Sequence, residues 1–89
     1  MLVRVMLLGS LKPPRMPKKI EVDLKADSNL ANLIEKLREI YPETAESLRD
    51  PMGGSLIMVS GVEVENLGGF DTPLVEGSEI VLVPVTHGG

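Results

Sequence analysis

Cysteine and tryptophan are absent from the 89 residues, and histidine occurs once, as His87. Without cysteine the chain forms no disulfide, offers no thiolate to a metal and has no cysteine nucleophile. A metal site built on histidine is disfavoured as well, so we expect no bound metal. Tyr41 and Phe70 are the only aromatic residues. The chain therefore lacks the stacking platforms that bind single-stranded nucleic acid.

Long apolar runs and net positive charge are also missing. No apolar run approaches the roughly 20 residues that cross a bilayer, and residues 1–14 have neither the basic start nor the apolar length of a signal peptide. The formal net charge of −4 disfavours nucleic acid as a partner. We therefore expect a cytoplasmic protein that binds neither membranes nor nucleic acid.

The length bounds the class of function. A chain this short holds one domain and buries only about 60–65% of its unfolded surface, which leaves little room for a deep enzymatic pocket. A carrier, binding or subunit role is favoured over an enzyme.

Two strands that are apolar on both faces are predicted at opposite ends of the chain, at residues 2–8 and 80–85. Shorter strands with alternating patterns are expected at 20–24, 56–59 and 62–65. The segment 12–19 is rich in proline and lysine and is expected to be a solvated basic loop. Pro84 is expected where strand pairing has stopped, because proline has no N–H to donate.

The clearest helical pattern covers residues 30–41, where apolar residues recur at helical spacing and polar residues fill the other face. Ser28 is the expected N-cap, and Pro42 ends the helix. The order is ββαβββ. Pairing the two apolar strands at the centre predicts an α+β protein, with a mixed sheet of four to five strands and one helix on one face. This is the β-grasp arrangement, expected over residues 1–85.

The last third of the chain carries a connected set of motifs: residues 59–64 (VSGVEV), 70–74 (FDTPL), 76–85 (EGSEIVLVPV) and the pair Gly88–Gly89. In this order they resemble MoaD/ThiS-type ubiquitin-like sulfur carriers, in which a "VNG…V" turn, an "L…PL.DGDEV" turn and a "PPV.GG" tail recur. Ser60 stands where asparagine is usual, and His87 where a small residue is common. Length and first strand fit the MoaD-like and archaeal modifier branch.

The resemblance implies that the reactive group is the C-terminal carboxylate of Gly89, carried on a flexible tail, residues 86–89. Thr86, His87 and Gly88 would be recognised by the partner enzyme. An adenylating enzyme of the MoeB/ThiF or ubiquitin-activating type would consume ATP to activate the carboxylate, and this chain would bind no cofactor itself. A general-base role for His87 is disfavoured, because a flexible tail does not hold a base in position.

Three functions remain open. The first is a MoaD-like sulfur carrier, which as a thiocarboxylate donates sulfur to a pterin precursor in a MoaE-like large subunit during molybdenum cofactor biosynthesis. The second is a protein modifier, joined through Gly89 to lysines of target proteins. A plain interaction domain with an inert tail is the third possibility.

Strand alternation also predicts a docking face on the side of the sheet away from the helix. An apolar patch with a charged rim is typical of an interaction site, although an ordinary half-exposed sheet is the alternative. The resemblance implies that the activating enzyme and the large subunit bind this face. Its expected residues are Arg4, Met6, Met58, Val81 and Val83.

Overall fold

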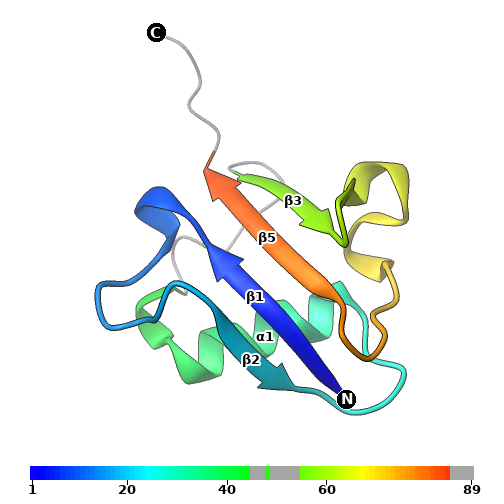
Figure 1. Ribbon diagram of the computed structural model, residues 1–89, viewed down its shortest axis with the longest axis horizontal. Coiled ribbons are helices and arrows are strands. Elements are labelled where there is room, and N and C mark those ends of the chain that lie inside the picture. The colour runs from blue at the N-terminus through cyan, green and yellow to red at the C-terminus, as the bar shows by residue number, and fades with distance from the viewer. Residues whose placement is uncertain (45–47, 49–54, 85–89) are drawn as a thin grey trace, which may run out of the picture.

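A computed structural model describes residues 1–44, 48 and 55–84 of the chain (Figure 1). Within them lie five strands and one α-helix. The strands are β1 (Leu2–Leu7), β2 (Ile20–Asp23), β3 (Ser55–Val59), β4 (Val62–Glu63) and β5 (Glu79–Pro84), and the helix is α1 (Leu30–Ile40). No helix among these residues has both the length and the apolar character needed to cross a membrane.

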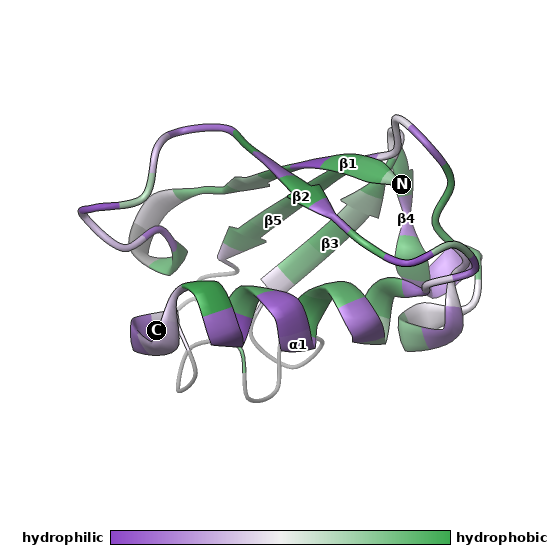
Figure 2. Ribbon diagram, turned by 90° about the horizontal axis from the view of Figure 1, so that it is seen from below, coloured by the Kyte–Doolittle hydropathy of each residue, from purple (hydrophilic) through white to green (hydrophobic). Residues whose placement is uncertain are grey.

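The sheet order is β2-β1-β5-β3-β4. The two apolar strands, β1 and β5, are parallel neighbours at its centre, with Val5 opposite Ile80 and Leu7 opposite Leu82. All other strand pairs are antiparallel. The helix covers one face of the sheet (Figure 2). The predicted mixed sheet and β-grasp arrangement are therefore confirmed.

The core lies between α1 and the sheet. Leu33 and Leu37 are fully buried in one cluster with residues of the two central strands, as the helical periodicity predicted. Six strand residues that face the helix are at most 1% exposed: Val3, Val5, Leu7, Ile57, Ile80 and Leu82.

The predicted N-cap of the helix is wrong by one residue. Asn29 caps α1: its side chain accepts a hydrogen bond from the backbone N–H of Asn32 at 3.0 Å, and the Asn32 side chain accepts one from the Asn29 N–H at 2.9 Å. Ser28 is buried, and its hydroxyl donates to the Lys25 carbonyl at 2.7 Å. The cause is long-range, because Asn29 pairs with Pro73 as an isolated bridge that holds the entry to the helix extended.

The prediction for Pro84 is correct on one side of β5 only. Pro84 is the last residue of β5 and lies opposite Ser55 of β3. On the other side of β5, the Leu8 N–H donates to the Leu82 carbonyl at 3.0 Å. The next bond of a parallel ladder would need an N–H at residue 84, which proline lacks. Pairing therefore stops at Pro84 on the β1 side only.

Strand β4 is shorter than the pattern predicted. It ends at Glu63, because residues Val64–Asn66 form a 3₁₀ turn that buries Val64.

The proline-rich segment 12–19 is a loop with a largely exposed surface, as predicted, but part of it packs on the protein. Met16 is 1% exposed, and Arg15 extends to the C-terminal end of α1. The Arg15 guanidinium donates to the Ile40 carbonyl at 2.9 Å and to both carboxylate oxygens of Glu43, and it lies 4.5 Å from the centre of the Tyr41 ring. A cation at this end of a helix also interacts favourably with the helix dipole.

Candidate functional site

The face of the sheet away from α1 is built by strand alternation. Val5 and Leu7 of β1 point into the core, whereas Arg4 is exposed and Met6 half-buried. Along β5, Ile80 and Leu82 are buried, whereas Val81 and Val83 are half-buried on the opposite side. The predicted inside and outside assignment of both central strands is confirmed.

The register brings the outward side chains of three adjacent strands together. Met6 of β1 and Met58 of β3 both lie opposite Val81 of β5, and Leu56 lies opposite Val83. The structure thus places all five predicted docking residues on one face, and it adds Leu56, which the sequence reasoning missed. The signal was available, because Leu56 and Met58 are two residues apart on one strand. We call this surface the outer face: Arg4, Met6, Leu56, Met58, Val81 and Val83.

Charged residues border the apolar centre of the outer face. Arg4 lies opposite Glu79 of β5 and Glu21 of β2, and its Nη1 is 3.3 Å from Oε1 of Glu79. On the far side, Glu63 of β4 lies opposite Met58. Both members of the Arg4–Glu79 pair are exposed, so the pair contributes about 0–1 kcal/mol to stability. Its position gives the face a charged rim.

Two turns contact the start of β5, and in the first of them the Ser60 N–H donates to the Glu79 carbonyl at 2.7 Å. Ser60 and Gly61 both have positive φ angles, 49° and 85°, as in the type I′ turns that join antiparallel strands. In the second turn Gly77, with φ 83°, donates its N–H to the Leu2 carbonyl at 2.8 Å, and the Glu76 carboxylate accepts from the Leu2 N–H at 3.1 Å. These contacts tie the start of β5 to the start of β1.

The predicted reactive tail, Thr86, His87, Gly88 and Gly89, lies outside the described residues. The structure does define the strand that leads to it. Val83 is the last residue of the outer face before the tail, and Pro84 ends the strand. Among the described residues, no group of three histidine, cysteine, aspartate or glutamate side chains is arranged to hold a metal ion.

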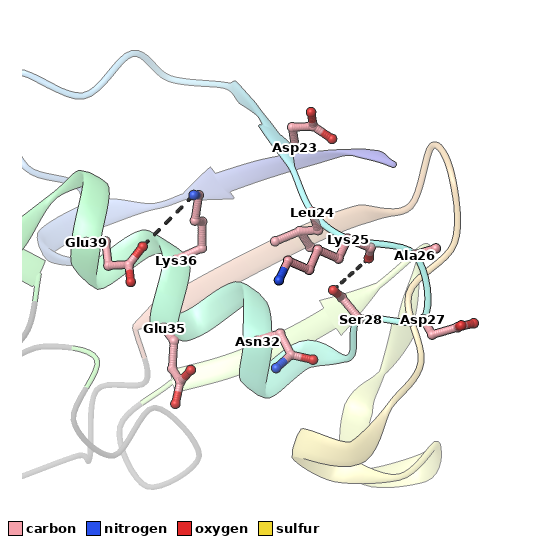
Figure 3. Close-up of a pocket in the computed structure, with 10 residues that line it drawn as sticks. All are labelled: Asp23, Leu24, Lys25, Ala26, Asp27, Ser28, Asn32, Glu35, Lys36 and Glu39. Carbon is pink, nitrogen blue, oxygen red and sulfur yellow. Dashed lines mark hydrogen bonds and ion pairs between the residues drawn. The ribbon is translucent and has the colours of Figure 1, made fainter.

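A groove that the sequence did not predict lies between the β2–α1 connection and one flank of α1 (Figure 3). Its volume is about 500 Å³. Lys25 and Lys36 extend over it together with Glu39, and Lys36 Nζ is 4.0 Å from Oε2 of Glu39. Because charges of both signs line the groove, it selects no ligand of one charge.

The chain is similar to known proteins in its structure. No family model matches the sequence, and no curated protein matches it. Solved structures do match. The small archaeal modifier protein SAMP1 from Methanosarcina acetivorans has a TM-score of 0.79 at 20% identity, over 99% of this chain and 96% of that one. SAMP1 from Haloferax volcanii has a TM-score of 0.78 at 19% identity, over 100% of both chains.

A third match comes from the protein–protein complex of subunits 1 and 2 of molybdopterin-converting factor from Helicobacter pylori. The TM-score is 0.63 at 25% identity, over 100% of both chains. These structures agree with the resemblance that the sequence motifs indicated. The chain has the ubiquitin-like β-grasp fold that these archaeal modifier proteins and the matching chain of the molybdopterin-converting factor complex share.

Proposed function

We propose that this chain is a ubiquitin-like sulfur carrier whose reactive group is the C-terminal carboxylate of Gly89. One observation carries the proposal. The apolar outer face of a β-grasp sheet is built around β5, and β5 is the strand that leads into the Gly88–Gly89 tail. A partner that binds Val81 and Val83 therefore also contacts the strand from which the segment with the reactive group continues.

The chemistry needs an activated carboxylate, because oxide is a poor leaving group. In an adenylating enzyme of the MoeB/ThiF or ubiquitin-activating type, a Gly89 carboxylate oxygen attacks the α-phosphorus of ATP and pyrophosphate leaves. A sulfur nucleophile then attacks the acyl carbon, and AMP leaves. This chain has no cysteine, so the partner supplies the sulfur. Gly88 and Gly89 present the slimmest backbone to a narrow active site.

We propose that the sulfur is transferred to a pterin precursor while this chain is bound to a MoaE-like large subunit, as in molybdopterin formation. The support is the match, at 25% identity over the full length of both chains, to a protein solved as part of the complex of subunits 1 and 2 of molybdopterin-converting factor.

The second candidate function is protein modification. Its support is the likeness to SAMP1 from two archaea, named as small archaeal modifier proteins, at TM-scores of 0.78 and 0.79. In this case the amine of a target lysine attacks the same acyl-adenylate, AMP leaves, and an isopeptide bond forms. Both functions use the same face and the same carboxylate.

The test combines the chain with an adenylating enzyme from the same organism, ATP and a sulfur source, followed by intact mass and fragmentation of the C-terminal peptide. Exchange of one oxygen for sulfur at Gly89 supports carriage, whereas ladders on other proteins support conjugation. Fragmentation is needed because oxidation of one methionine adds nearly the same mass. The chain lacking Gly89 is the control. A wild-type chain that stays unmodified beside an enzyme proven active contradicts both functions.

A further inference from the structure

The sulfur atoms of this chain are unevenly placed. The five methionines are its only sulfur-containing residues, since cysteine is absent. Met16 is 1% exposed, and Met1 packs against the core. Met1 is half-buried like Met6 and Met58, but only Met6 and Met58 lie on the outer face.

The register places these two methionines in one row across the sheet, on either side of Val81, although they are far apart in the sequence. Each lies opposite Val81, one on either neighbouring strand. With strands about 4.8 Å apart, their Cα atoms are about 10 Å apart across the sheet. The two thioethers therefore flank the centre of the apolar surface, with Val83 and Leu56 in the next row.

We propose that Met6 and Met58 form a reversible oxidation site that controls docking on the outer face, an inference that rests on the proposed function. The thioether sulfur attacks one oxygen of hydrogen peroxide, an S–O bond forms, the O–O bond breaks and water leaves. The sulfur is oxidised by two electrons and the peroxide is reduced. A methionine sulfoxide reductase reverses the step when two thiols become a disulfide and the sulfoxide oxygen leaves as water.

The sulfoxide oxygen changes the surface without changing the fold. On a half-exposed sheet, water solvates the new dipole. In the centre of a docked interface the same oxygen is buried without a donor, which opposes binding. Oxidation of Met16 would have a different effect, because a polar group at that site enters the core. Exposure thus separates a change in docking from damage to the fold.

The experiment treats the purified chain with hydrogen peroxide, removes the oxidant with catalase, and maps each methionine in proteolytic peptides. We expect Met6 and Met58 to oxidise at least about tenfold faster than Met16, with an unchanged circular dichroism spectrum. We expect adenylation by the partner enzyme to slow by about tenfold or more. Methionine sulfoxide reductase with dithiothreitol should restore it. Oxidation of Met16 at the same rate as the other two overturns the proposal.

The matched control is the double variant Met6→Leu/Met58→Leu, which conserves side-chain volume and keeps Met1, Met16 and Met52. Peroxide should leave its adenylation rate unchanged. If peroxide slows adenylation of the double variant as much as that of wild type, the oxidation proposal is overturned. It is also overturned if wild type oxidised at both Met6 and Met58 keeps its full adenylation rate. Neither result contradicts the proposed function. If the double variant folds poorly, the two single variants replace it. Peroxide should still slow the adenylation of each single variant, but less than that of wild type. If the untreated wild type is not adenylated, the proposed function is contradicted, and the oxidation proposal with it.

Discussion

At the scale of single residues, alternation along β5 decides which side chains are available to a partner. Ile80 and Leu82 are at most 1% exposed in the core, whereas Val81 and Val83 are half-buried on the outer face. A change at Val83 therefore tests docking with little disturbance of packing against the helix. The tail stays intact in such a variant.

We predict that Val83→Asp folds and loses adenylation. On the half-exposed sheet the change should cost about 1 kcal/mol of unfolding free energy, chiefly through lower β-propensity. In a docked interface the buried, unpaired carboxylate should reduce binding by several kcal/mol. Circular dichroism and an adenylation assay measure the two effects separately.

Val75→Asp is the matched control for this experiment. Val75 is 65% exposed, lies in the turn before β5, and is not part of the outer face. It should be adenylated at the wild-type rate. If Val83→Asp is also adenylated at that rate, recognition does not use the outer face.

At the scale of elements, α1 stabilises the sheet through one row of side chains. Leu37 is fully buried, whereas Ile40, one turn along, is 39% exposed. We predict that Leu37→Ala lowers the unfolding free energy by about 2–5 kcal/mol, through lost burial and the cavity that remains. Chemical denaturation measures it. Ile40→Ala is the comparison and should cost clearly less. A cost below about 1 kcal/mol for Leu37→Ala would contradict the packing of α1 on the sheet.

A second element-scale contact joins the loop after β1 to the C-terminal end of α1. The hydrogen bonds from Arg15 hold the pKa of the Glu43 carboxyl below its ordinary value, and the same contact raises the pKa of Arg15. A carboxyl with a lowered folded-state pKa stabilises the fold above its unfolded-state pKa of about 4.3, and the contribution disappears as pH falls through the folded-state value.

We therefore predict that Glu43→Gln lowers the thermal midpoint at pH 7 and that its difference from wild type vanishes in acid, at a pH below the folded-state pKa of Glu43. Thermal melts across this pH range measure the difference. Because both side chains are exposed, the effect at pH 7 should be small and should shrink in high salt. A difference that persists unchanged in acid would mean that the glutamine disturbs packing and that the charge is not the cause.

At the scale of the whole molecule, the sequence predicts the strands, helix and faces that depend on local periodicity. Two segments apolar on both faces identify the central strands, and one amphipathic stretch identifies the helix. The outer face follows from the same alternation. What the sequence does not show depends on contacts between distant segments. Asn29 replaces Ser28 as the cap because of its bridge to Pro73. Arg15 stays exposed but binds the C-terminal end of α1, because that end lies beside its loop.

The site divides in the same way. The sequence predicts the face of the sheet on which Val81 and Val83 lie, because side chains alternate along every strand. The burial pattern of β5 agrees with that prediction. The reactivity of Gly89 follows from a resemblance between motifs, and no contact among the described residues bears on it. It therefore stays a prediction.

The last prediction separates the fold from the tail. The buried core of the described residues lies between Val3 and Leu82, and the strand that leads to the tail ends at Pro84. Deleting Gly88 and Gly89 should therefore leave the thermal midpoint unchanged, since glycine has no side chain to pack. The same deletion should abolish adenylation, because the reactive carboxylate would then end on a different residue.

Replacing Gly88 with alanine is the graded control. It keeps the chain length and the carboxylate of Gly89 but adds a Cβ where the partner's site is narrow. We expect slower adenylation with an unchanged midpoint. A deletion that lowers the midpoint markedly would show that the tail belongs to the folded domain. In that case the separation between residues 1–85 and 86–89 fails, and a carrier that presents its terminus freely to a partner is no longer the best description of the molecule.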